Sequence, residues 1–160
     1  MKLFTKALIS GAVALAVSTS LVQASQPAKS QKHAEYVTET RQAIFTLLGS
    51  NMGALGAMAK GKIPVNADVA EKNATRINQL SLMIADYTRT DTSTFKVKTE
   101  ALNVIWTKSD EFAKSIERLT LASANLQVAA KSKDEAAIKK AIGGVGKSCG
   151  GCHDVFKQDD

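Results

Sequence analysis

The strongest constraint on this chain is a pentapeptide close to its C-terminus, Cys-Gly-Gly-Cys-His at residues 149–153. Residues three and four apart share one face of a helix, so Cys149, Cys152 and His153 can project to the same side. Two thiols spaced in this way can form thioethers with the two vinyl groups of a porphyrin, and the imidazole can then reach the iron as its axial ligand. The motif therefore predicts covalently attached haem c, with His153 as the proximal ligand.

Other uses of two closely spaced cysteines fit the sequence less well. A thiol redox pair belongs near a βαβ pattern, which this sequence lacks. A zinc site needs four ligands, and the only histidine outside the motif is His33. A disulfide between Cys149 and Cys152 would be strained and would close almost no loop. Haem attachment is the interpretation that uses all three side chains.

The first 24 residues are expected to be a signal peptide that is removed on export. Lys2 and Lys6 precede an apolar run from Ala7 to Val22, and cleavage is expected after Ala24. An uncleaved membrane anchor is the alternative. However, polar residues interrupt the run and no charged stop-transfer segment follows it. Residues 25–160 would then form one domain, located in the periplasm and not inserted in the membrane.

The charge of the exported chain is mild. The formal net charge of the whole chain is +6, and it falls to +4 once Lys2 and Lys6 are removed. Such a balance suits a soluble protein that meets acidic redox partners. Neither a basic stripe nor interleaved aromatic and basic residues is present, so the sequence does not indicate a nucleic-acid partner.

The rest of the sequence predicts helices. It contains only two prolines, and its apolar residues recur at spacings of three and four. Four amphipathic helices are expected, at about 32–55, from about 68 to 87, at about 110–131, and from a cap at Ser132 through the haem motif. The expected inward-facing positions on the first two helices include Val37, Ile44, Phe45, Met52, Ile84 and Tyr87. The predicted fold is all-α, an antiparallel four-helix bundle with covalently attached haem c in its core.

Local signals mark the helix ends and one long connection. Asn66 or Asp68 can cap the second helix, and Ser132 with Glu135 forms a candidate capping box for the fourth. Residues 89–98 are polar and predict a long connection, a kind of segment that is often functional.

Two features break the helical pattern. Arg41 falls on the apolar stripe of the first helix, where a charge is costly unless it is paired. Either its side chain extends to the edge of the bundle or it pairs with a haem propionate. Gln42 either donates to the same carboxylate or is solvated.

The second feature is a cluster of five glycines in the last helix, at positions 143, 144, 146, 150 and 151. Together they would cost about 4 kcal/mol relative to alanine in a helix interior. We infer that haem attachment and packing hold this segment helical. The missing side chains would also let the porphyrin or a neighbouring helix approach closely.

The sequence resembles the class II cytochromes c, and cytochrome c′ in particular. Beyond the haem motif, the resemblance is carried by Tyr36, by Arg41-Gln42-Ala43, by Ala101–Trp106 and by residues 149–156. It covers essentially all of residues 25–160. It implies that Cys149 and Cys152 are the thioether sites and that His153 is the only protein ligand of the iron. It also implies haem contacts from Arg41 and Gln42 with a propionate, and from Thr99 or Glu100.

The same resemblance assigns the distal position to Phe45. Low-spin relatives place a ligating methionine there, and phenylalanine cannot bind iron. Met52, Met58 and Met83 lie at other offsets and are expected to fill the core. Lys157 stands where the family often has arginine, so the positive charge is kept but the planar guanidinium group is lost. The resemblance thus implies a high-spin iron with one protein ligand, open to NO and CO, with Phe45 as a steric gate.

These observations predict a periplasmic monohaem cytochrome that carries one electron and binds diatomic gases. The alternative is a low-spin class II cytochrome c that acts purely in electron transfer. Peroxidase or NO-reducing activity ranks last, because no distal acid–base pair is evident near Phe45. The resemblance also implies a homodimer formed through the first two helices.

Overall fold

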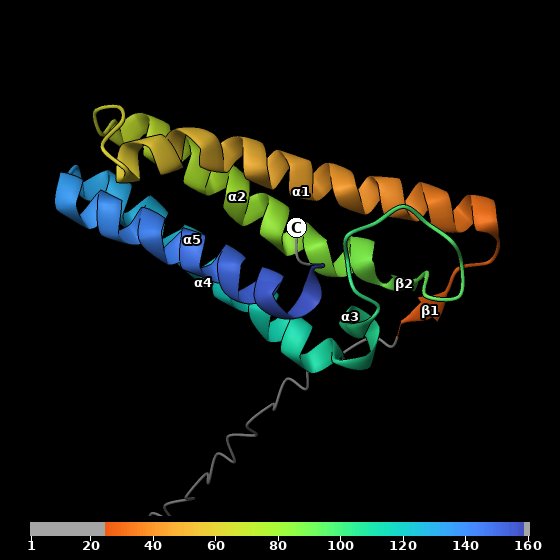
Figure 1. The fold of residues 1–160 in the computed structure, drawn as a ribbon. Helices are drawn as coiled ribbons and strands as arrows, with labels where there is room; N and C mark the ends of the chain where they lie inside the picture. The colour runs from red at the N-terminus through yellow and green to blue at the C-terminus, as the bar shows by residue number, and fades with distance from the viewer. Residues whose placement is uncertain (1–24, 159–160) are drawn as a thin grey trace, which may run out of the picture.

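The computed structural model describes residues 25–158, and four long helices form its body (Figure 1). They are α1 (Gln31–Ala59), α2 (Ala67–Thr88), α4 (Ser109–Ser132) and α5 (Glu135–Phe156). The α1–α2 loop and the α4–α5 turn lie at the same end of the molecule, so successive long helices run antiparallel. The predicted antiparallel four-helix bundle is confirmed. Within the described residues, no helix is both long enough and apolar enough to cross a membrane.

Polar side chains begin the first two helices. Ser30 caps α1, and its Oγ accepts a hydrogen bond from the backbone N of His33 at 3.2 Å. Asn66 caps α2, and its Oδ1 accepts from the backbone N of Val69 at 3.0 Å. Of the two caps expected for this helix, Asn66 is therefore correct. Asp68 lies inside the first turn, where a negative charge favours the helix N-terminus.

The start of α5 differs from the expected capping box. Ser132 is the last residue of α4, and Lys133 adopts a left-handed conformation with φ of 58° that ends that helix. Asp134 caps α5 instead, because its Oδ1 accepts from the backbone N of Ala136 at 2.8 Å and of Ala137 at 3.0 Å. The cap therefore lies two residues further along the chain than the sequence pattern suggested.

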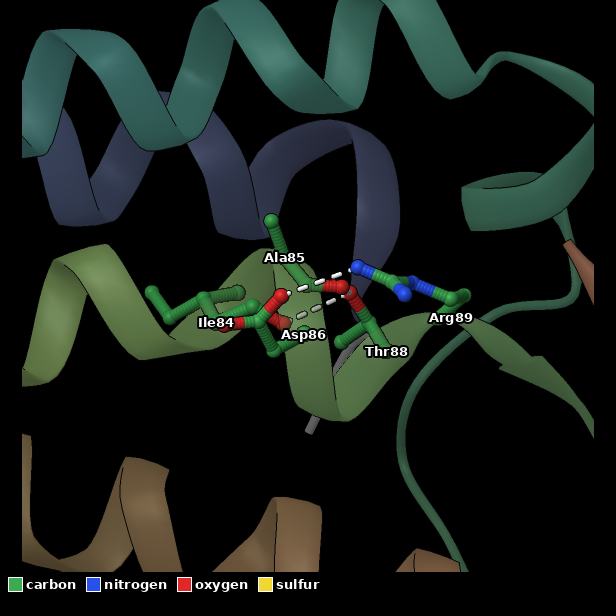
Figure 2. Close-up of polar contacts among 5 residues, drawn as sticks. All are labelled: Ile84, Ala85, Asp86, Thr88 and Arg89. Atoms are coloured by element: carbon green, nitrogen blue, oxygen red, sulfur yellow. Dashed lines mark hydrogen bonds and ion pairs between the residues drawn. The ribbon is translucent and has the colours of Figure 1, made fainter. Parts of the chain in front are cut away.

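The last turn of α2 is held by polar contacts shown in Figure 2. The Thr88 hydroxyl donates to the carbonyl oxygens of Ile84 at 2.7 Å and Ala85 at 3.3 Å. The Arg89 guanidinium pairs with the Asp86 carboxylate at 3.0 Å. These bonds fix the point at which the chain leaves the bundle and enters its longest connection.

That connection, residues 89–108, closes one end of the bundle. It holds β2 (Thr90–Asp91) and the single-turn helix α3 (Val104–Thr107). β2 pairs in parallel with β1 (Gln26–Pro27), which precedes α1. The connection was predicted, but this strand pairing was not, because two-residue strands leave no periodic signal.

Apolar side chains from all four long helices form one core. Met58 belongs to it, as expected, with 2% of its surface exposed. Met83 and Tyr87 were expected inside but are 38% and 40% exposed. The inward stripe of α2 runs instead from Ile84 to Thr88, which turns Tyr87 toward the surface.

The helices do not pack equally closely. α2 and α4 make the most extensive contact, and polar groups bridge them. Asn78 Nδ2 donates to the Thr120 carbonyl at 2.9 Å and to Ser123 Oγ at 3.2 Å, and the hydroxyls of Ser81 and Thr120 lie 2.8 Å apart. α1 and α5 touch far less. The bundle is therefore closed along α2–α4 and open along α1–α5.

Candidate haem site

A cavity of about 1020 Å³ lies inside the bundle, at the end closed by the connection. Its volume is at the upper limit for small-molecule and cofactor sites, which are commonly about 300–1,000 Å³. Side chains from every long helix and from the connection line it. The lining includes every residue that the sequence analysis placed at the haem: Arg41, Gln42, Phe45, Thr99, Glu100, Cys149, Cys152 and His153.

The two cysteines lie on the face of α5 that borders this cavity. Both are half-buried, and neither forms a disulfide. Burial raises the pKa of both thiols above the ordinary value. At Cys152 this effect is opposed by the Ser115 hydroxyl and by the positive charge of Arg118. Two protonated thiols three residues apart at the edge of a large apolar cavity suit thioether bonds to one porphyrin.

His153 lies one helical turn after Cys149 and also lines the cavity. Its place directly after Cys152 puts an imidazole at the same edge as the thiols. In the part of the chain described by the structure, no three or more His, Cys, Asp or Glu side chains gather as a metal-ion site. The donors at this cavity therefore fit haem c, which needs two thiols and one imidazole, and do not fit a four-ligand zinc centre.

Arg41 is buried beside the cavity, with only 5% of its surface exposed. Its Nη2 donates to the hydroxyls of Thr38 and Thr92, both at 2.8 Å, and its guanidinium lies 5.3 Å from the centroid of the Trp106 ring. Burial lowers the Arg41 pKa, an effect that the nearby Asp91 carboxylate opposes. The idea that this side chain extends to the bundle edge is therefore wrong. The guanidinium is held inside by neutral hydroxyls.

Trp106 has a structural role beside the cavity. Its indole Nε1 donates to the Thr88 carbonyl at 3.0 Å, which links α3 to the end of α2. Its ring also supports Arg41 through a cation–π contact. Trp106 thus helps fix the guanidinium that borders the cavity.

The wall of the cavity contributed by the connection is tied to helices on both sides. On one side, Gln42 Nε2 donates to the Lys98 carbonyl at 2.9 Å. On the other, the Glu100 carboxylate pairs with Lys157 Nζ at 3.3 Å, and the Gln158 backbone N donates to the Glu100 carbonyl at 2.8 Å. Sequence reasoning missed the pairing of Glu100 with Lys157, because contacts so distant along the chain leave no local pattern.

Phe45 lies at the open edge of the cavity and is 41% exposed. It follows Arg41 by one turn of α1, with Gly49 and Met52 further along the same cavity-lining edge. Phe45 is therefore not the buried core aromatic that its spacing also allowed. Met52 is half-buried and borders the cavity, so its role is broader than filling the core.

The glycines of α5 are not required by any neighbouring helix. No heavy atom outside the local helix backbone lies within 4 Å of the place where a Cβ would stand at Gly143, Gly144, Gly146, Gly150 or Gly151. The expectation that these positions admit close approach of another helix is wrong. Of these five glycines, Gly146 alone lines the cavity.

Comparison with known proteins agrees with this geometry. The family model described as Cytochrome C′ matches residues 36–157. Cytochrome c-554 of Cereibacter sphaeroides is 34% identical over 149 residues, which is 92% of this chain and 97% of the relative. Cytochrome c prime from Shewanella frigidimarina has a similar structure, with a TM-score of 0.65 and 40% identity over 79% of this chain and 97% of that one.

A third similar structure is a nitric oxide complex of a variant of cytochrome c prime from Alcaligenes xylosoxidans. Its TM-score is 0.70, with 25% identity over 79% of this chain and 97% of that one. The fold and the cavity together define a four-helix-bundle c-type cytochrome. The chain belongs to the cytochrome c′ family, whose members carry a covalently bound haem c.

Proposed function

We propose that this protein is a periplasmic monohaem cytochrome that transfers single electrons and binds NO and CO. The observation that carries the proposal is one cavity whose lining holds the thiols of Cys149 and Cys152, the imidazole of His153 and the ring of Phe45. Three of these side chains can bind haem, and the fourth cannot coordinate iron. Family membership supports the same assignment.

In this proposal each side chain has a defined task. Cys149 and Cys152 form the thioethers, and His153 is the only protein ligand of the iron. When bound, the haem supplies an iron that exchanges one electron and has a coordination position for a diatomic ligand. Arg41 and Gln42 contact a propionate, and Thr99 and Glu100 contribute further haem contacts. Buried and held by two threonines, Arg41 is already positioned to meet an anionic group.

Phe45 determines what can occupy the distal side. Its ring lies at the cavity edge, can exclude bulky ligands, and offers no proton to an oxygen-derived intermediate. Electron transfer and gas binding therefore suit this site better than peroxidase chemistry. The nitric oxide complex of the Alcaligenes xylosoxidans relative supports NO as a ligand.

Export to the periplasm is supported by the sequence of residues 1–24, which lies outside the described residues. Basic residues followed by an apolar run are typical of a secretory signal. Mass analysis of the purified protein tests this directly. A chain that still begins at Met1 would contradict cleavage after Ala24.

The absorption spectrum of the purified protein, ferric and ferrous, before and after NO, tests the central proposal. We expect a high-spin spectrum that changes when NO is added. A low-spin spectrum unaffected by NO would overturn the gas-binding proposal and favour pure electron transfer. Met52 borders the cavity and would then be the first candidate for the sixth ligand, to be checked with Met52→Leu.

We also propose a homodimer formed through α1 and α2. These helices pack against one another and carry exposed apolar side chains, Tyr36 and Leu47 on α1 and Met83 and Tyr87 on α2. Burying such side chains is the main driving force for association. Redox partners with acidic surfaces are expected from the mild positive charge of the exported chain.

A further inference from the structure

The stretch of α5 that carries the haem motif is intrinsically a poor helix. Five of its residues between 143 and 151 are glycine. Each glycine disfavours the helix about four- to fivefold relative to alanine. As shown above, a Cβ at any of these positions would touch nothing outside the local helix backbone. Four of the five, Gly146 being the exception, also lie away from the cavity lining. Packing within the described chain therefore does not explain why they are glycine.

The same stretch also has little packing to compensate. Before it, Ile138, Ile142 and Val145 are at most 2% exposed and fix α5 in the core. From residue 146 to residue 153, the inner face of α5 instead borders the cavity of about 1020 Å³. In a chain to which haem has not yet been attached, the cavity takes the place of side-chain contacts along much of this face, so burial stabilises it little.

Beyond the motif the helix is fixed again. Phe156 is 4% exposed, and its ring packs edge-to-face on Phe112 with centroids 5.1 Å apart. The Leu102 backbone N donates to the Phe156 carbonyl at 2.9 Å. Residues 146–153 thus form a weak segment between two well-packed anchors.

We propose that residues 146–153 unwind locally in the haem-free chain and that Gly146, Gly150 and Gly151 make this opening frequent enough for haem attachment. The inference rests on the proposed thioether role of Cys149 and Cys152. Opening exposes both thiols to a haem that bears two vinyl groups. Each S–H then adds across one vinyl C=C, with sulfur bonding to the carbon next to the ring and hydrogen to the outer carbon. Atoms and electrons balance without an oxidant or a reductant.

Hydrogen exchange on the full-length haem-free chain tests the opening. The test variant is Gly150→Ala with Gly151→Ala, two exposed positions inside the opening segment that do not line the cavity. The matched control is Gly53→Ala with Gly56→Ala on α1, where a Cβ also meets nothing. We expect amides of 146–153 to exchange about 20-fold more slowly in the test variant and at the wild-type rate in the control. Equal slowing of these amides in both variants would mean that they exchange through global unfolding, which would overturn the proposal. Exchange at the wild-type rate in the test variant, or no protected amides anywhere in the haem-free chain, would overturn it as well.

The yield of attachment tests the consequence. All three proteins are produced in an exporting bacterial host, and the fraction carrying covalent haem is read from the intact mass early in expression. We expect a lower haem-bearing fraction for the α5 variant and a wild-type fraction for the α1 control. Equal fractions would overturn the proposal. Alanine raises helix propensity, so neither variant is expected to fail in folding.

The attachment experiment can succeed or fail independently of the proposed gas-binding function. The haem-bearing molecules of each variant are expected to have the wild-type spectrum, because neither pair of substitutions alters a proposed haem ligand. If wild-type holoprotein failed to bind NO, the gas-binding proposal would fall. The difference in attachment between the two variants would be unaffected.

Discussion

Phe45 and Arg41 lie one turn apart on α1 and border the same cavity, yet the surrounding structure constrains them very differently. Arg41 is fixed by hydroxyls from α1 and from the connection and by the Trp106 ring. Phe45 is 41% exposed at the cavity edge. Replacing Phe45 should therefore change access to the cavity, whereas replacing Arg41 should change the stability of the protein.

Phe45→Ala is expected to raise the association rates of CO and NO with the ferrous protein about tenfold, equivalent to about 1.4 kcal/mol of the entry barrier. The reason is that the substitution removes the ring at the open edge of the cavity. Stopped-flow absorption or flash photolysis measures these rates. Leu121→Ala is the control, since Leu121 is 56% exposed and lies on α4 away from the cavity. Unchanged rates in Phe45→Ala would reject the steric gate.

Arg41→Met is expected to lower the free energy of unfolding of the haem-loaded protein by about 1–3 kcal/mol. The substitution leaves the buried hydroxyls of Thr38 and Thr92 without their charged donor, and hydrogen bonds to charged groups contribute roughly that amount. Urea unfolding followed by circular dichroism gives the value. Arg76→Met, at an exposed position of α2, should change it by no more than about 0.5 kcal/mol. Equal effects from the two substitutions would argue against a special role for Arg41.

At the scale of the element, apolar spacing predicted the long helices, whereas the buried polar contacts between elements were not predicted. The periodicity located α1, α2, α4 and α5 because each buries one apolar stripe. It could not show that Thr38 and Ser123 are buried, since hydrogen bonds to neighbouring groups make polar side chains acceptable inside. It also missed that Thr92, far along the chain, completes the surroundings of Arg41.

The α4–α5 turn allows a direct test at this scale. Asp134→Ala removes the side chain that accepts from the backbone N of Ala136 and Ala137, and should lower the free energy of unfolding by about 1 kcal/mol. Ser132→Ala should cost less, because Ser132 belongs to the end of α4 and does not cap α5. Thermal or urea unfolding of the two variants measures both free-energy changes and shows which side chain caps α5. A larger loss from Ser132→Ala would restore the capping box expected from the sequence.

At the scale of the whole molecule, the bundle is built around one closed seam and one open seam. Hydrogen bonds of Asn78 and Ser81 join α2 to α4, whereas the cavity separates much of α1 from α5. The haem motif on α5 could be recognised from spacing alone, because its three side chains lie within five residues. The cavity wall formed by residues 98–101 could not be recognised from the sequence, because only the folded chain brings these residues beside the end of α5.

The outer surface of α1 and α2 leads to a prediction about assembly. If the protein dimerises there, Leu47→Glu should shift it toward monomers, because a charge would replace a side chain that is 51% exposed in the monomer and buried between subunits. Sedimentation velocity at micromolar concentration measures the shift. Val128→Glu is the matched control, being 70% exposed on α4, and should leave the sedimentation coefficient unchanged. A wild-type protein that sediments as a monomer, or a shift caused equally by Val128→Glu, would exclude an interface specific to α1 and α2.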